Sequence, residues 1–411
     1  MLRSMFSAIS GLRAHQTMMD EIGNNIANVN TVGYKSGRVN FQDILSQTFR
    51  GASASQGGLG SINPAQVGLG VTVAGIDVIM TQGNLQSTGR LTDMAIQGDG
   101  FFALSDGSRQ YFTRDGSFDI GLGGNLINPA SGLKVQGWNA DASGKIDTTT
   151  AATDVIIPIG TRTTALATSK ATITGNLDAA AATDDTATTT LTVVDSLGVS
   201  HAVQVTFTKT ADNTWGWKAA NPDANDKSFS TTSTGTVTFS SDGTYATSNT
   251  AASIALTLAN GATAAQTVDL TMSGMTGYQG TSALNAQADG FTSGTLTTFT
   301  IGSGGDITGV FSNGQTQLLG QIALASFVNP GGLLRQGQNL FAASSASGSA
   351  SVGIPGSGGR GTVTTGSLEM SNVDLATQFT SMITAQRGFQ ANGKVITTSD
   401  EMLQTLVNLK Q

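Results

Sequence analysis

The sequence predicts a mainly β protein whose two ends are α-helices that lie together as a coiled-coil-like pair. Near both ends, apolar residues recur at alternating spacings of three and four, the period of a helix with one packing face. Between the ends, short apolar runs alternate with polar residues and are separated by Asp-Gly and Asn-Gly turn signals. The β texture after about residue 293 matches the texture before residue 164, which predicts one β-domain inserted into another.

Composition excludes several classes of partner. The chain has 411 residues, long enough for two or three domains. Only 11% of its residues are charged and its formal net charge is −7, so nucleic acid and anionic membranes are poor partners. No apolar run reaches the roughly 18 residues of a membrane span, which predicts no membrane insertion. Small neutral side chains instead suit surfaces that contact copies of the same chain, because few charges must be desolvated.

The sequence also bears on redox chemistry and on secretion. Cysteine is absent, so disulfides and thiolate chemistry are excluded. The first residues do not match a cleavable signal peptide, because serines interrupt the apolar stretch after Arg3. If the protein leaves the cell, we expect it to do so without a conventional signal peptide.

The first helix is predicted over 1–30 and is expected to stop at Gly33. Phe6, Met18 and Ile22 lie outside its heptad frame, so a second face is also apolar. The apolar members of the frame are Leu2, Met5, Ile9, Leu12, Met19 and Ile26.

The last helix is predicted over 372–411. Ser371 to Asp374 predict a capping box, with Met370 and Leu375 as a hydrophobic staple around it. The apolar members of its frame are Leu375, Phe379, Met382, Phe389, Ile396 and Leu403.

The two sets of frame residues are here called the assembly seam. The simplest arrangement packs the two seams against each other and brings the chain ends together. Both frames also contain Gln, Gly or Asp, and a helical Gly costs roughly 1 kcal/mol relative to Ala. The ordinary alternative is a globular core, but a lone pair of this kind would be weak. We therefore expect intermolecular packing, with ends that are disordered in the free monomer.

Between the helices, four regions are predicted. A Gly/Ser/Gln-rich connecting segment covers 31–72, an intermediate β-domain covers 73–163 and 293–371, and an outer β-domain covers 164–292. Asp195 to Gly198 and Asn260-Gly261 predict hairpin turns in the outer domain.

Catalytic motifs are missing. The chain has two histidines, His15 and His201, and for His201 a hydrogen-bonded structural role is favoured over ligation because it lies on an apolar strand face. Gly98-Asp99-Gly100 lacks the third glycine of a dinucleotide loop, and no phosphate loop or EF-hand occurs. The sequence predicts no enzyme, no cofactor and no metal.

Two short motifs carry a resemblance to a known family. Residues 27–35, Ala-Asn-Val-Asn-Thr-Val-Gly-Tyr-Lys, closely resemble the segment after the first helix in flagellar rod and hook axial proteins. Residues 371–375, followed by 385–392, resemble the C-terminal signature of that family. The motif residues are Ala27, Asn28, Thr31, Gly33, Tyr34, Lys35, Ser371, Asn372, Val373 and Asp374. Gly393 departs from the family, which more often has Ala, and this puts the straightness of the last helix in question.

The resemblance implies a flagellar hook subunit, a structural protein that polymerises with itself into a flexible tube between the motor's rod and the filament. It implies export through the flagellar type III apparatus, and contacts with the distal rod, the hook cap and the hook-filament junction proteins. It also implies an extracellular location. Two alternatives remain: a distal rod subunit, which the length of 411 residues disfavours because rod proteins are typically shorter, and a Thr-rich surface adhesin.

Overall fold

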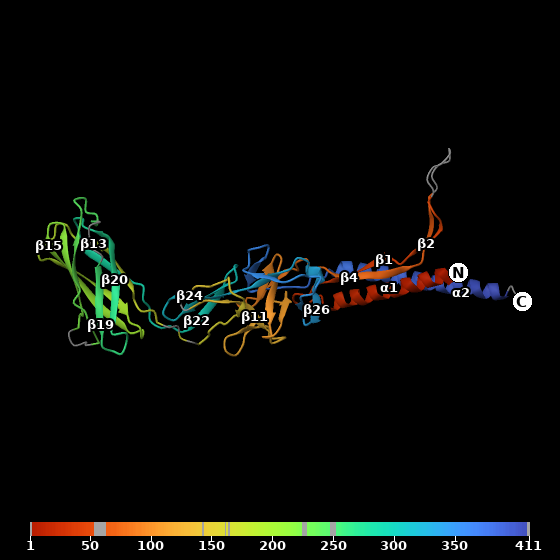
Figure 1. Ribbon diagram of the computed structural model, residues 1–411, viewed down its shortest axis with the longest axis horizontal. Helices are drawn as coiled ribbons and strands as arrows, with labels where there is room; N and C mark the ends of the chain where they lie inside the picture. Colours follow the sequence, from red (N-terminus) through yellow and green to blue (C-terminus); the bar gives the residue numbers. More distant parts are fainter. Residues whose placement is uncertain are drawn as a thin grey trace, which may run out of the picture. The chain divides into compact units, whose positions relative to one another are not determined.

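The computed structural model describes residues 2–52, 63–141, 144–160, 162, 165–223, 228–246 and 252–408. It is mainly β with one long helix at each end, and the two helices pack together, which confirms the predicted fold class. The chain divides into two compact units (Figure 1). The first unit comprises Met1–Ile157, Thr300–Thr308 and Leu318–Gln411, and the second comprises Pro158–Phe299 and Gly309–Gln317. The expected outer domain, 164–292, falls within the second unit, whereas the terminal helices and most of the expected intermediate domain share the first.

The helical part of the first unit contains two helices and two antiparallel strand pairs. Strands β1 and β4 pair with each other and pack on α1, and β2 pairs with β3. The bounds are α1 (Leu2–Ala27), β1 (Gly37–Asp43), β2 (Ser46–Arg50), β3 (Ala65–Gly68), β4 (Val71–Val78) and α2 (Leu375–Asn408).

These bounds correct three expectations. The segment 31–72 is no plain connection, because its described residues form most of both strand pairs; Ser53 to Gly60 lie outside the described residues. Helix α1 ends at Ala27, six residues before Gly33. Gly33 instead has a positive φ of 68° in a turn, where a Cβ would lie 2.6 Å from the amide nitrogen of Asp115. Helix α2 runs without interruption through Gly393.

The cap of α2 also differs from the prediction. Asp374, the residue before the helix, accepts a hydrogen bond from the amide of Ala376 at 2.9 Å and another from the Thr377 hydroxyl at 2.7 Å. It is therefore the N-cap itself, and these bonds lower its pKa. Ser371 lies three residues too early to cap the helix, so the expected capping box is wrong.

The β part of the first unit is built around a sheet in which β24 (Thr316–Ile322), β11, β7, β8, β27 and β26 follow one another. Phe101, Phe112, Leu333 and Phe341 form its apolar core on one side. The Asp106-Gly107 turn joins β7 to β8, as the sequence predicts. The bounds are β5 (Leu85–Ser87), β6 (Met94–Gln97), β7 (Phe101–Ser105), β8 (Gln110–Thr113), β9 (Asp119–Ile120), β10 (Leu126–Ile127), β11 (Lys134–Asn139), β12 (Thr153–Asp154), β25 (Leu324–Ser326), η1 (Pro330–Gly332), β26 (Leu334–Gly337), β27 (Leu340–Ala342), β28 (Ser351–Gly353), β29 (Thr362–Thr365) and β30 (Ser367–Glu369).

The second unit is a β-sandwich. One sheet has the order β17-β19-β20-β13-β21 and the other β14-β15-β16-β18, and buried side chains of both form one core. The predicted turns are confirmed: Asp195 to Gly198 joins β14 to β15, and Asn260-Gly261 lies between β19 and β20. The bounds are β13 (Lys170–Asn176), β14 (Thr186–Val194), β15 (Ser200–Ala211), β16 (Thr214–Ala220), β17 (Phe229–Ser230), β18 (Thr234–Thr238), β19 (Ala252–Leu258), β20 (Ala265–Thr276) and β21 (Ala283–Ala288). Three further strands carry residues of both units: β22 (Leu296–Ile301), β23 (Asp306–Phe311) and β24 (Thr316–Ile322).

A buried polar group joins the two sheets of this sandwich. His201 Nε2 lies 3.0 Å from Asp195 Oδ2, and the Asn260 side-chain amide donates to the same oxygen at 2.5 Å. Burial by itself raises the pKa of Asp195, but the hydrogen bonds from His201, Asn260 and two backbone amides outweigh it and lower the pKa to about 2. The predicted structural role of His201 is confirmed.

We expect Asp195→Asn to destabilise the second unit by about 2 kcal/mol near neutral pH, from the pKa of about 2 against 3.8 when unfolded. Because the folded pKa is the lower one, the native stabilisation is present above pH 4 and is lost as the pH falls towards 2. The difference between parent and variant should shrink over that range. Urea unfolding checks this, followed by fluorescence of Trp215 and Trp217 in a Trp138→Phe background.

Asp242→Asn is the matched control, since Asp242 caps an exposed turn of the same unit through Thr244. It should change the unfolding free energy little. A parent-to-Asp195→Asn difference that does not vary between pH 7 and pH 2 would contradict the assigned role.

Candidate assembly site

The terminal helices run antiparallel in a fixed register. Asn25 of α1 donates to the Gln378 side chain of α2 at 3.2 Å. A Cβ on Gly388 would lie 2.5 Å from His15 Nε2, and a Cβ on Gly11 would lie 2.5 Å from Asn392 Nδ2. Close approach of the two helices therefore depends on small residues at the points of contact.

The buried positions of the pair are not the assembly seam. On α1, the buried residues are Ala8, Gly11, Ala14, Ile22 and Asn25, of which Ala14 lines a hollow towards β4 instead of the contact with α2. On α2, Ala385 and Ser399 are buried. These residues lie on stripes adjacent to the predicted frames, so the expectation that the two apolar seams pack against each other is wrong. A stripe of small and polar residues makes the contact inside the chain.

The seam residues instead remain partly or largely accessible. Leu375, Phe379 and Phe389 are exposed, and Phe379 retains 50% of its accessible surface. The side chain of Leu2 lies outside the described residues. The partly buried members are Met5, Ile9, Leu12, Met19, Ile26, Met382, Ile396 and Leu403.

Exposed apolar side chains continue along α2, and α1 adds Phe6. A soluble monomer rarely leaves such a series uncovered, and contiguous apolar surface marks a site of association. Among the described residues, the exposed large apolar side chains of the helices are Phe6, Leu375, Phe379, Ile383, Phe389, Val395, Met402, Leu406 and Val407.

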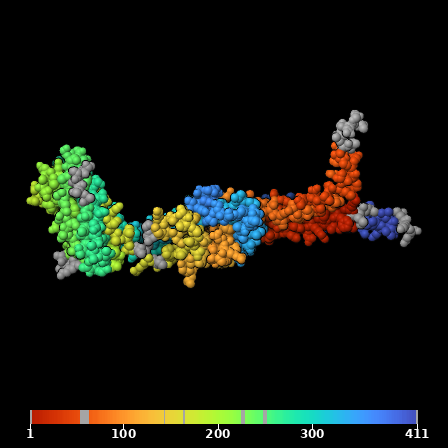
Figure 2. All heavy atoms as spheres, in the orientation of Figure 1, coloured from red at the N-terminus to blue at the C-terminus, as the bar shows by residue number. Residues whose placement is uncertain are grey.

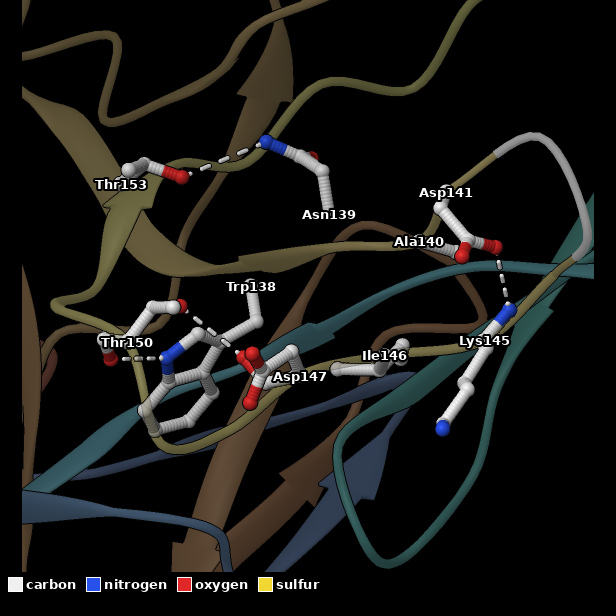
Figure 3. Close-up of a pocket in the computed structure, with 9 residues that line it drawn as sticks. All are labelled: Trp138, Asn139, Ala140, Asp141, Lys145, Ile146, Asp147, Thr150 and Thr153. Atoms are coloured by element: carbon white, nitrogen blue, oxygen red, sulfur yellow. Dashed lines mark hydrogen bonds between the residues drawn. The ribbon is translucent and has the colours of Figure 1, made fainter.

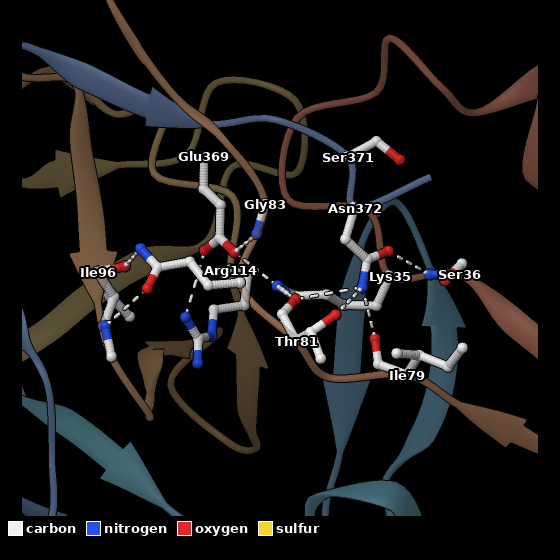
Figure 4. A network of polar contacts seen from close by, with 12 residues as sticks. Lys35, Ser36, Ile79, Thr81, Gly83, Ile96, Arg114, Glu369, Ser371 and Asn372 are labelled. Carbon is white, nitrogen blue, oxygen red and sulfur yellow. Dashed lines mark hydrogen bonds and ion pairs between the residues drawn. The ribbon is translucent and has the colours of Figure 1, made fainter. Parts of the chain in front are cut away.

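A buried charge cluster fixes the base of the helix pair to the β part of the first unit (Figure 4). Lys35 Nζ lies 2.5 Å from Glu369 Oε1, and Arg114 Nη1 lies 3.2 Å from Glu369 Oε2. The three side chains are at most 3% exposed. Glu369 also accepts from the amide of Gly83 at 2.9 Å, and its backbone oxygen accepts from the amide of Gly33 at 2.7 Å.

Burial is the main influence on Lys35 and lowers its pKa, while the carboxylate of Glu369 opposes that shift. The ammonium group also donates to the backbone oxygen of Thr81 at 2.8 Å. One carboxylate thus serves two buried cations that lie far apart in the sequence.

The motif residues that the sequence singled out gather around this cluster. Asn372 Oδ1 accepts from the amide of Ser36 at 2.8 Å, and its side-chain amide donates to Ile79 and Thr81. Tyr34 donates to Asn25 Oδ1 at 3.2 Å. The backbone amide of Asn372 also donates to the backbone oxygen of Tyr34 at 3.4 Å, so the motif before α2 contacts the motif after α1 directly.

The other motif residues have local roles. Ala27 is the last residue of α1 and is exposed. Asn28 donates to the backbone oxygen of Asn24 and accepts from the Thr31 hydroxyl. Val373 is partly buried, and Ser371 accepts a 3.3 Å hydrogen bond from its amide.

Sequence reasoning missed Glu369 and Arg335. Arg335 donates to the backbone oxygen of Lys35 at 2.6 Å and its guanidinium lies over the ring of Tyr34 at 5.5 Å. One signal could have found Glu369: the chain has only three glutamates, and Glu369 alone lies outside the terminal helices, between apolar neighbours.

The hollows of the described residues hold no catalytic arrangement. A hollow of about 560 Å³ beside β11 is lined by Trp138, Asp141, Asp147 and Thr150 (Figure 3). Its polar groups are already engaged: Trp138 Nε1 donates to Thr150 at 2.8 Å, and Asp147 accepts from Thr149. Among the described residues, no three metal-ligating side chains gather where they could hold an ion.

Ser228 Oγ lies 3.5 Å from His201 Nδ1 in the second unit, which completes a serine-histidine-aspartate series. The His201 side chain is only 2% exposed, so a substrate has no access to it. Within the described residues, neither helix combines the length and apolar character that a membrane crossing requires.

Comparison with known proteins finds matches to both helical ends and to both β regions of the chain. Four family models align in order: a flagella basal body rod protein model over 5–35, the flagellar hook protein FlgE/F/G D1 domain over 95–169, the flagellar basal body protein FlaE D2 domain over 162–291, and the flagellar basal body rod FlgEFG C-terminal model over 364–409. The flagellar hook protein FlgE of Treponema pallidum is 41% identical with full coverage of both chains. The chain belongs to the flagellar hook protein family.

Other relatives agree with this assignment. The hook protein FlgE of Escherichia coli is 37% identical over 98% of this chain and 99% of its own. The crystal structure of Helicobacter pylori hook protein FlgE2 shares the fold, with a TM-score of 0.54, 14% identity, and coverage of 68% of this chain and 98% of that one.

One relative corrects an argument from length. The flagellar basal-body rod protein FlgG of Bacillus subtilis is 33% identical over the full length of both chains. A chain of this size is therefore compatible with a protein named for the rod. Length does not distinguish a hook subunit from a rod subunit.

We expect Glu369→Gln to destabilise the first unit by about 3–5 kcal/mol, because it leaves Lys35 and Arg114 buried without a carboxylate. Adding Lys35→Met should recover part of that loss, since one of the two unpaired cations is then removed. Chemical denaturation of the purified chains measures both values. The control is Glu401→Gln, on an exposed position of α2, which should be neutral. Equal stability of Glu369→Gln and the parent would show that the carboxylate does not hold the junction.

Proposed function

We propose that the chain is a structural, non-enzymatic subunit of the bacterial flagellar hook. Copies assemble into a flexible tube that acts as a universal joint and transmits torque from the rod to the filament. Its location is extracellular, on the flagellum. The single observation that carries this proposal is the series of exposed apolar residues on α2, joined by Phe6 of α1, while the contact between the two helices within the chain uses a different, small-residue stripe.

Partners follow from the same proposal. The chain contacts itself, the distal rod, the hook cap and the hook-filament junction proteins, and it passes through the flagellar type III export apparatus. A role for each end in self-assembly agrees with the presence of exposed apolar side chains on both α1 and α2.

Two alternatives remain distinguishable. A distal rod subunit is supported by the full-length likeness to the Bacillus subtilis protein named for the rod, at 33% identity, although the hook proteins of Treponema pallidum and Escherichia coli are more similar, at 41% and 37%. A Thr-rich surface adhesin is not supported by the paired end motifs. Electron microscopy of purified appendages separates a curved tube from a straight rod and from a surface fibre.

The proposal is tested at Phe389, whose ring is exposed in the single chain. Phe389→Asp is expected to leave the β-domains folded and to abolish polymerisation, because every interface between copies would bury an unpaired carboxylate at a cost of several kcal/mol. Sedimentation and electron microscopy of the purified protein measure this. Gln390→Asp, on the neighbouring exposed position, is the matched control and should polymerise normally. Normal tubes from Phe389→Asp would rule out the seam as the interface.

A further inference from the structure

Helix α2 extends beyond α1 at the free end of the pair. The register that places Gly11 beside Asn392 and His15 beside Gly388 brings Leu2 opposite Glu401. Residues 402–408 therefore have no α1 residue opposite them, an overhang of about 10 Å at 1.5 Å per residue. Figure 2 shows this blue end of α2 projecting past the red surface of α1.

The overhang is apolar and uncovered. Met402, Leu406 and Val407 are exposed, with 50%, 53% and 65% of their surfaces accessible. Met402 and Leu406 are four residues apart and lie on one helix stripe, which is the pattern of a helix that lays anchors into a groove.

A groove of matching character lies on the other side of the same helix pair. It runs between α1 and β4, has a volume of about 560 Å³, and is called here the α1–β4 groove. Its apolar lining residues are Phe6, Ile9, Ala14, Ile44, Val71 and Val73. Phe6 and Ile44 are more than half exposed, so no described part of the chain fills it.

Charge complements the apolar match. Arg13 lines the groove, and no acidic side chain lies within ion-pair distance of it in the described part of the chain. The overhang, 402–408, carries no positively charged side chain and adjoins Asp400 and Glu401, which are both exposed. Arg13 at the groove of one copy would therefore lie near two carboxylates of its neighbour.

We propose that the α2 overhang of one copy occupies the α1–β4 groove of a second copy. This inference rests on the proposed self-assembly and names one contact within it. The α2 overhang and the α1–β4 groove are different surfaces of the chain, so the contact is heterologous and repeats from copy to copy. Heterologous contacts that do not close into rings produce open helical polymers.

The groove and the overhang of one chain cannot meet each other. The groove lies beside Ser10 and Ala14, near the point where α1 contacts Asn392. Val407 is 15 residues further along α2, or about 22 Å, whereas a disulfide requires Cα atoms within roughly 7 Å. A Val73–Val407 crosslink therefore reports contact between two copies.

The absence of cysteine makes the experiment direct. Val73→Cys with Val407→Cys is assembled under reducing conditions and then oxidised, and denaturing electrophoresis is run without reductant. We expect a ladder of dimers, trimers and longer products, because each copy donates one overhang and receives another. Thr72→Cys with Leu406→Cys is a second pair at the same contact, in case the first variant fails to fold. The single-cysteine variants show how much crosslinking arises by chance.

The matched control is Val73→Cys with Val395→Cys, which places the second thiol on α2 outside the overhang. Polymers that form normally but give no ladder with either overhang pair would overturn the contact and leave the proposed function standing. A ladder from the Val395 variant alone would overturn it too, because the groove would then hold the middle of a neighbour's helix. If the cysteine-free parent fails to polymerise, that result would instead contradict both the proposed function and the proposed contact.

Discussion

The buried carboxylate of Glu369 joins parts of the chain that the sequence keeps far apart. Lys35, which it binds at 2.5 Å, lies 334 residues earlier, and Arg114 comes from the β part of the first unit. Removing one partner of such a cluster leaves an uncompensated buried charge, so the three side chains must come together for the unit to fold. Glu369 therefore fixes the position of the end of α1 and the start of α2 relative to the β strands. The antiparallel register of the two helices follows from these two fixed ends.

The helix pair that grows from this junction buries little apolar surface of its own. Gly11 and Gly388 allow close approach, but glycine contributes no side chain to a core. The larger side chains, such as Phe379 and Phe389, remain exposed. This division separates two tasks: the small stripe defines the pair inside one chain, and the large apolar faces are available to other copies. The β-domains, by contrast, have complete apolar cores without a partner.

Periodicity alone predicted both helices and their pairing, because large apolar residues at spacings of three and four dominate the pattern. It could not identify the contacting face, since Ala8, Gly11 and Gly388 carry almost no apolar signal. The Asn260-Gly261 hairpin was predictable because the turn chemistry is local. Strands β2 and β3 were not, because all their residues are exposed and show no alternation of burial. Glu369 was missed for a further reason: its partners are defined only by the tertiary fold.

The central claim is that the terminal helices depend on neighbouring copies for their stability. Amide hydrogen exchange of α1 and α2, measured on free monomer and on polymer of the same chain, tests this most directly. The account predicts that α1 and α2 exchange rapidly in the monomer and slowly in the polymer. The β-domains should exchange slowly in the monomer and in the polymer. Strong protection of α1 and α2 in the free monomer would contradict it, because the small-residue contact would then suffice without any neighbour.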